Sequence, residues 1–228
     1  MRGLPRQARR SALWALPAWA WRAAKGRSWY RRELRIYCYP AERISVLPRP
    51  RLLQRDCIDD LDRYERTEHA QMPADVYRDV ARQRLAQGHH LYTLVEGRRL
   101  LHYGWLIDRQ ARGEDRALGQ VFFPPPDSAA LYDYFTHPQA RGHGLYRQAL
   151  CQVLHDAHEH AGARQAYIYV YADNHASRHV VERIGFHYAG SLVKERRFFT
   201  DRHYAVAAHA GFEAGLLTGV RPCQTVIR

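Results

Sequence analysis

Residues 132–146 read Tyr-Asp-Tyr-Phe-Thr-His-Pro-Gln-Ala-Arg-Gly-His-Gly-Leu-Tyr, and this stretch decides the fold predicted for the whole chain. Aromatic and β-branched residues at its start are typical of a strand, and the proline and two glycines that follow indicate a turn. After the turn, apolar residues recur at helical spacing, at Tyr146, Leu150, Val153, Leu154 and Ala157. Gly162 stands where such a helix is expected to end. The sequence therefore predicts a strand, a glycine-rich turn and a helix in direct succession.

A glycine-rich turn at the start of a helix suits an anion. The first amides of a helix have no intrahelical acceptor, and the helix dipole places about half a positive charge there. Gly142 and Gly144 let a ligand approach the backbone, and Arg141 adds a charged fork that suits phosphate. The turn is not a Walker loop, because no Gly-Lys-Ser/Thr follows, and it lacks the third glycine of a dinucleotide fingerprint. We predict a site for a phosphorylated cofactor; for a glycine pair alone, a plain strand-to-helix turn is the alternative.

The turn resembles motif A of the GNAT acyltransferases, in which Gln/Arg-x-x-Gly-x-Gly/Ala binds the pyrophosphate of acetyl-CoA. Here the signature is Gln139, Gly142 and Gly144, with Arg141 and His143 between them. A second segment is similar to the family's Asn-x-x-Ala/Ser…Gly-Phe pattern and reads Asn174-His175-Ala176-Ser177, a helix with Val180 and Ile184 inward, and Gly185-Phe186. With two matched segments in the right order and spacing, the chain is identified as a member of this family.

The resemblance implies an α/β (α+β) fold in which helices flank a mixed central sheet of about six to seven strands. Two parallel strands, 131–136 and 166–171, are expected to splay apart and admit the pantetheine arm of acetyl-CoA or another acyl-CoA. No metal is expected. The residues expected to bind the cofactor are Phe135, Thr136, Arg141, Gly142, His143, Gly144, Leu145, Tyr146, Asn174 and Ser177.

The proton donor is the main departure from the family pattern. Many members place a tyrosine four residues before the glycine of Gly-Phe, where it protonates the leaving thiolate, and this chain has Val181 there. The remaining candidates are Tyr146, Tyr169, Tyr171 and Ser177, and stabilisation of the thiolate by solvent is a further alternative. A second departure is Tyr146 itself, which could cover the cofactor or shape the acyl pocket.

Asp133 is the candidate general base, because it is the only carboxylate on the central strand. A carboxylate in a partly dry cleft has its pKa raised towards the useful range. Two alternatives stay open: Asp133 pairs with an arginine or caps a turn, or a chain of waters serves as the base.

The remaining elements are predicted from periodicity and turn residues. We expect a strand at 34–39, a connection at 41–51, a hairpin of 91–95 and 100–107, a loop at 108–119, a short strand at 121–123, and last strands within 186–193 and 196–208. Two amphipathic helices are predicted at 52–66 and 73–87, the second with an inner stripe of Val76, Val80 and Leu85.

The formal charge of +12 is uneven along the 228 residues. We expect a basic, tryptophan- and arginine-rich segment at 1–33, followed by the GNAT domain at 34–228. The positive charges before the first acid, Glu33, are Arg2, Arg6, Arg9, Arg10, Arg22, Lys25, Arg27, Arg31 and Arg32. The segment either contacts a membrane surface or a polyanion, or is a solvated extension. A secretory signal fits least, because Pro17 interrupts the apolar run 12–20.

Cysteine and histidine usage argues against export and against a metal. Cys38, Cys57, Cys151 and Cys223 show no metal-type or disulfide spacing, which fits a reducing cytoplasm, and Cys151 is expected to pack within its helix. The histidines form no His-Glu-x-x-His pattern, and His155 and His158 are expected on the wet face of their helix.

Three functions are compatible with these patterns. The leading one is transfer of acetyl from acetyl-CoA to a primary amine of a small molecule, such as an amino sugar, which a loose likeness to GNAT proteins of bacterial surface-polysaccharide and lipid biosynthesis implies. The second changes the acceptor to a protein or peptide amine, or the donor to a longer acyl-CoA. The third is a non-catalytic module that binds coenzyme A. A homodimer is compatible with the sequence, and no specific nucleic-acid motif is present.

Overall fold

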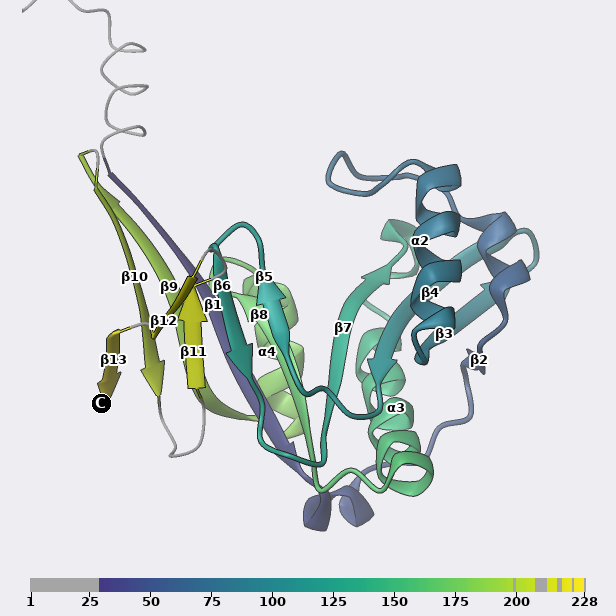
Figure 1. Ribbon diagram of the computed structural model, residues 1–228. Coiled ribbons are helices and arrows are strands. Elements are labelled where there is room, and N and C mark those ends of the chain that lie inside the picture. Colours follow the sequence, from purple (N-terminus) through teal and green to yellow (C-terminus); the bar gives the residue numbers. More distant parts are fainter. Residues whose placement is uncertain (1–28, 199, 208–212, 217–218, 223, 228) are drawn as a thin grey trace, which may run out of the picture.

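The computed structural model describes residues 29–198, 200–207, 213–216, 219–222 and 224–227 (Figure 1). Within these residues a nine-stranded sheet has the order β13-β10-β9-β1-β8-β7-β4-β3-β2, and a four-stranded sheet has the order β12-β11-β6-β5. The elements are β1 (Trp29–Pro40), η1 (Ala41–Val46), β2 (Gln54–Arg55), η2 (Ile58–Arg63), α2 (Ala74–Ala86), β3 (His89–Glu96), β4 (Arg99–Ile107), β5 (Gly113–Asp115), β6 (Gln120–Phe123), β7 (Ser128–Thr136), η3 (Pro138–Ala140), α3 (Leu145–Ala161), β8 (Gln165–Tyr171), α4 (His175–Ile184), β9 (His187–Arg197), β10 (Thr200–Ala207), β11 (Glu213–Leu216), β12 (Gly219–Pro222) and β13 (Gln224–Ile227).

The predicted mixed α/β fold is confirmed. The main sheet is antiparallel except where β7 lies parallel to β8 and β10 lies parallel to β13. Its seven inner strands, from β10 to β3, match the expected six to seven, and the short strands β2 and β13 extend the two edges. The deciding stretch forms β7, the turn and α3, and Gly162 ends α3 with a left-handed backbone, φ 64°.

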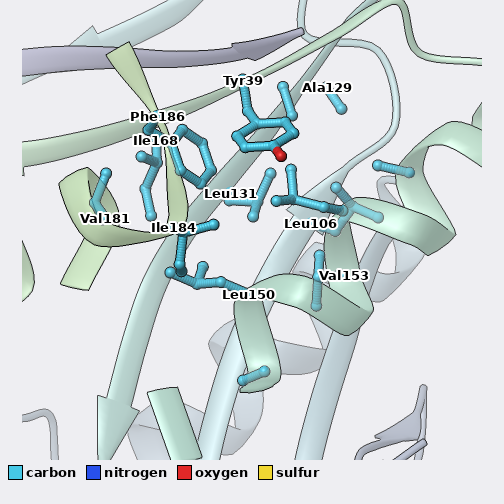
Figure 2. Packing of buried hydrophobic residues seen from close by; sticks show 14 of the residues in the cluster. Tyr39, Leu106, Ala129, Leu131, Leu150, Val153, Ile168, Val181, Ile184 and Phe186 are labelled. Atoms are coloured by element: carbon cyan, nitrogen blue, oxygen red, sulfur yellow. The ribbon is translucent and has the colours of Figure 1, made fainter. Parts of the chain in front are cut away.

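Helices α3 and α4 cover one face of the main sheet. Figure 2 shows Leu150 of α3 and Val181 and Ile184 of α4 directed towards Leu131 and Ile168 of the two central strands, and all five are buried. Burial of such apolar side chains is the main force that holds the helices on the sheet. This packing holds the starts of α3 and α4 against the same pair of strands.

The opposite face is covered by two separate groups of elements. Beside β3 and β4, α2 and η2 pack Tyr77 and Leu61 onto Trp105. Beside β1, β8 and β9, the four-stranded sheet packs Phe122 against a second cluster that includes Tyr167. Figure 1 shows these two groups on either side of β7.

The helix predicted at 52–66 is wrong. The chain there forms only β2 and the 3-10 helix η2. The backbone amides of Leu52 and Leu53 both donate to the side-chain oxygen of Gln152 on α3, at 2.8 and 2.9 Å. Asp56 then adopts a left-handed backbone, φ 59°, which a helix does not permit. Contacts distant in sequence therefore override the local apolar pattern.

The helix predicted at 73–87 is confirmed as α2, and Leu85 packs against the core as predicted, but Val76 was wrongly placed on the inner face. Tyr77 and Ala81 are buried, whereas Val76 is 45% exposed. The hydroxyl of Tyr77 accepts a hydrogen bond of 2.9 Å from the indole nitrogen of Trp105, which fixes that face against β4. Tyr77, whose hydroxyl has a polar partner, therefore occupies the inner face of α2.

The second sheet combines the short strand predicted at 121–123, which is β6, with segments for which no strand was predicted. Within the predicted loop 108–119 lies β5, and β11 of the C-terminal segment pairs with β6. At the other end, β1 is described from Trp29, before the expected domain start at 34, and residues 1–28 lie outside the described part of the chain. No helix among the described residues has the length and apolar character needed to cross a membrane.

Candidate functional site

The central strands β7 and β8 part at the middle of the sheet. They pair in parallel only where Ser128–Leu131 faces Gln165–Ile168. Beyond this point β7 continues beside β4 as far as Thr136, and β8 continues beside β1 as far as Tyr171. Among the described strands, none pairs with the two edges that face each other beyond Leu131, and this is the splay predicted for 131–136 and 166–171.

The glycine turn directs free amides outwards at the end of β7. Gly142 and Gly144 have left-handed backbones, φ 84° and 74°, which side chains rarely adopt. The first backbone bond of α3 runs from the Gln148 amide to the Gly144 carbonyl, at 3.1 Å. Among the described residues, the amides 142–147 meet no backbone or side-chain acceptor. The Arg141 amide is not part of this set, because it donates to Pro138 at 3.3 Å.

A cleft of about 620 Å³ lies between the end of β7, this turn and the starts of α3 and α4. It brings together nearly all of the expected cofactor-binding residues; those that line it are Phe135, Thr136, Arg141, Gly142, Gly144, Leu145, Tyr146, Asn174 and Ser177. His143 is exposed and does not line it. Free amides beside two glycines without side chains fit a diphosphate, so the residues present fit the cofactor that the sequence suggests.

The charged side chain of the turn already has a partner. The Arg141 guanidinium donates to Glu68 at 2.5 Å and to the Thr136 carbonyl at 3.0 Å, and lies 5.5 Å over the Phe135 ring. Glu68 lines the cleft from the loop between η2 and α2. Sequence reasoning missed Glu68, because no motif links a loop residue to a turn 73 positions later in the chain.

Residues 51–187 match the sequence profile of the acetyltransferase (GNAT) domain. The chain belongs to the GNAT acetyltransferase family. No curated protein sequence is significantly similar to it.

Several solved structures resemble the chain at low sequence identity. A GNAT acetyltransferase from Colwellia psychrerythraea is 16% identical over 75% of this chain and 57% of its own, with a TM-score of 0.49. A GCN5-related N-acetyltransferase from Sphaerobacter thermophilus is 13% identical over 82% of this chain and 59% of its own, with a TM-score of 0.48. A conserved protein of unknown function from Staphylococcus epidermidis is 12% identical over 81% of this chain and 69% of its own, with a TM-score of 0.48. The chain thus spans between 57% and 69% of the length of these three structures.

A tyrosine hydroxyl reaches the α4 wall of the GNAT cleft from α3. Val181 is fully buried in the core and carries no polar atom. One turn earlier on α4, the Ser177 hydroxyl lies 3.0 Å from the Tyr146 hydroxyl. Burial raises the pKa of Tyr146 to about 12, so its hydroxyl stays protonated at neutral pH. Tyr146 and Ser177 are therefore the two candidate donors that the structure brings together.

The other two tyrosine candidates lie on the far face of the sheet. The Tyr169 hydroxyl donates to Gln110 at 2.6 Å, and the Tyr171 hydroxyl donates to Asp115 at 2.6 Å. Both rings pack with the four-stranded sheet, because alternate residues of β8 face opposite sides. They do not line the 620 Å³ cleft.

His102 of β4 is a buried polar residue that sequence reasoning missed. It is 1% exposed, and its Nδ1 lies 2.8 Å from the Thr136 hydroxyl on the neighbouring strand. Its Nε2 is buried and has no hydrogen-bond partner within the part of the chain that the structure describes. Burial lowers the pKa of His102 to about 3, so the ring is neutral near pH 7. The ring packs beside Tyr134 and Tyr146, which both line the cleft.

A β-bulge sets the direction of Asp133. Tyr103 pairs with Phe135 and Trp105 pairs with Tyr132, so β7 carries one extra residue between these pairs, and Asp133 there has φ 53°. Asp133 accepts a hydrogen bond of 2.5 Å from Arg84 at the end of α2. This is the pairing with an arginine that the sequence left open, and it leaves the role as base a prediction.

Asn174 lies at the start of α4, as its motif predicted, whereas His155 is not where the sequence placed it. The Asn174 side-chain oxygen accepts from the Ser177 amide at 3.1 Å, so it caps α4 while it lines the cleft. His155 is buried and contacts Arg49 and the Leu47 carbonyl, which corrects its placement on the wet face. Nowhere among the described residues do three or more histidine, cysteine, aspartate or glutamate side chains gather to hold a metal.

Proposed function

We propose that this chain transfers an acyl group, most simply acetyl from acetyl-CoA, to a primary amine of a small molecule such as an amino sugar. One observation supports the proposal above all: the amides 142–147 have no acceptor among the described residues and lie beside left-handed Gly142 and Gly144 at the wall of a 620 Å³ cleft. An array of this kind binds a diphosphate through the backbone. Family membership supports the choice of an acyl-CoA.

Each side chain of the cleft has a separate part in this proposal. The glycine-turn amides would hold the diphosphate, and the splayed edge of β7 at Phe135 and Thr136 would accompany the pantetheine arm. The Thr136 carbonyl is bonded to Arg141, so a cofactor that drew Arg141 towards its phosphates would also free that carbonyl. Asn174, which caps α4, would keep the start of that helix in place beside the arm.

Bound acyl-CoA would supply a thioester, whose C–S bond is replaced by a C–N bond while the amine loses a proton and coenzyme A leaves as the thiol. Tyr146 has the protonated hydroxyl that stabilises a leaving thiolate, and Ser177 orients that hydroxyl at 3.0 Å. Asp133 is the candidate acceptor of the amine proton, and solvent is the alternative.

The test measures coenzyme A binding by calorimetry and thiol release from acetyl-CoA across a panel of primary amines. We expect binding and turnover of at least one amine. Binding without turnover of any small amine, peptide or longer acyl-CoA would favour a non-catalytic module, and the absence of binding by folded protein would overturn the proposal. Asp133→Asn should flatten the pH dependence of kcat/KM, and an unchanged profile would remove Asp133 as the base.

For the basic segment we propose contact with an anionic membrane surface, on the strength of its sequence. The described strand β1 begins at Trp29 and pairs with β9 from that residue on. A shortened chain should therefore begin at Trp29 and keep the sheet intact. Full-length protein should bind vesicles with anionic headgroups more tightly than the shortened chain, and equal binding would refute the idea.

A further inference from the structure

The guanidinium of Arg84 is held rigidly and has unused hydrogen-bond donors. It lies 5.0 Å from the centres of both the Trp105 and the Tyr132 rings. Its side chain is 18% exposed, and within the described chain its one hydrogen-bond partner is Asp133. Arginine carries five N–H donors, and none of the nitrogens of Arg84 is both buried and unpartnered. The spare donors therefore face solvent.

Asp133 is directed towards Arg84 by the bulge of β7. In a regular strand, Tyr132 and Asp133 would face opposite sides of the sheet. The extra residue and the left-handed backbone of Asp133, φ 53°, bring both onto the side of α2. A left-handed backbone at a residue other than glycine is an unfavourable conformation that is frequent at ligand sites. Asp133 is 35% exposed, so a ligand can reach its carboxylate.

This charged pair lies directly beside the cofactor cleft. The residues that follow Asp133 on β7 are Tyr134 and Phe135, and both line the cleft. Phe135 stacks on Tyr103 on the α2 side, at 5.5 Å, while Tyr134 packs on the α3 side. On the α3 side, the starts of α3 and α4 enclose the cleft proposed for the cofactor. An acceptor therefore has access to the splay from the side on which Arg84 and Asp133 lie.

We propose that Arg84 binds an anionic group, carboxylate or phosphate, of the amine acceptor, and that Asp133 receives the ammonium group of the same molecule. This rests on the proposed function and narrows its substrate class to amines that carry a negative charge. A planar guanidinium binds carboxylate and phosphate through two parallel hydrogen bonds. Because the two rings already hold Arg84 in place, binding sacrifices little further side-chain freedom. A bare polyamine would instead meet the positive charge of Arg84.

The alternative is that the Arg84–Asp133 pair only fastens α2 to β7. The two explanations differ in what they predict for matched amines. Loss of a structural fastening would lower the turnover of every acceptor or the stability of the fold. Loss of an anion receptor would lower the turnover only of acceptors that carry the anion.

The experiment compares three pairs of amines as acceptors for the full-length protein with acetyl-CoA. The pairs are L-phenylalanine and phenethylamine, L-lysine and cadaverine, and glucosamine 6-phosphate and glucosamine; they separate carboxylate from phosphate as the source of the charge. Each is tested with the wild type, Arg84→Gln, Arg84→Lys, and the control Arg82→Gln, whose exposed side chain pairs with Asp79. Ligand-observed NMR in the presence of coenzyme A measures binding independently of turnover.

We expect the wild type to favour the anionic member of at least one pair by about tenfold or more, since a hydrogen-bonded charge pair contributes at least that much. Arg84→Gln should abolish the preference while turnover of the neutral member changes little. Arg84→Lys, which keeps the charge, should keep part of the preference, and Arg82→Gln should keep all of it. Equal use of both members, equal loss of both in Arg84→Gln, or no binding of any anionic amine would overturn the proposal. Failure of the proposed function differs, because coenzyme A would then not bind.

Discussion

Replacing Glu68 with glutamine should tighten coenzyme A binding, which is opposite to the usual effect of removing a side chain from a site. Glu68 accepts a hydrogen bond of 2.5 Å from Arg141, and the two side chains are 43% and 49% exposed. A phosphate that binds Arg141 must first displace this carboxylate. Exposed ion pairs contribute about 0.2–1 kcal/mol, and Coulomb's law for charges about 4 Å apart in water gives about 1 kcal/mol. Glu68→Gln should therefore lower the Kd by up to about fivefold.

Isothermal titration of coenzyme A into the wild type and the variant measures this difference directly. The gain should shrink at about 1 M salt, where the Debye length falls to about 3 Å. The matched control is Glu65→Gln in the same loop, whose carboxylate lies 3.8 Å from His137 and does not contact Arg141. It should leave the Kd nearly unchanged. An unchanged or larger Kd for Glu68→Gln would refute the reasoning, because Arg141 would then not exchange Glu68 for phosphate.

Three further predictions concern the cleft. Tyr146→Phe removes the hydroxyl that contacts Ser177 and should lower kcat by about tenfold or more, with little change in KM for acetyl-CoA. An unchanged kcat would mean that solvent, and not Tyr146, stabilises the leaving thiolate. Gly144→Ala, at φ 74°, should lower the free energy of unfolding by about 1 kcal/mol and weaken coenzyme A binding. The control Gly97→Ala, at φ 57° in the β3–β4 turn, should lower the free energy of unfolding by a similar amount in thermal unfolding without affecting binding. Burial lowers the pKa of His102 to about 3, so below about pH 6.5 the unfolded chain binds a proton at His102 that the folded state does not. The free energy of unfolding should therefore fall by up to about 1.4 kcal/mol per pH unit from about pH 6.5 towards pH 3. His102→Gln should lessen this acid sensitivity, measured as the free energy of unfolding in urea at a series of pH values. If that free energy depends on pH equally in the variant and the wild type, the prediction is wrong.

Local patterns predicted the elements that carry the cofactor turn. The strand, the paired glycines and the helix of residues 132–146 are adjacent in sequence, so periodicity and turn chemistry specify them without distant contacts. The same reasoning failed at 52–66, where the apolar residues follow the period of a helix. There the side chain of Gln152, on an element far along the chain, holds Leu52 and Leu53 extended. A local pattern carries no information about such a partner.

By itself, the sequence determined the family, the glycine turn and most of the residues that line the cleft, because these depend on the short-range requirements of backbone conformation. Only the tertiary structure decided which side chains surround the chemistry. It paired Arg141 with Glu68, set Asp133 against Arg84, and brought Tyr146 to Ser177 on α4. The physical reason is that these contacts join residues on separate elements, whose distances are set by how α2, α3 and α4 pack on the sheet. Charge and hydrogen-bonding energies fall steeply with distance, so the sequence could propose these residues as candidates but could not pair them.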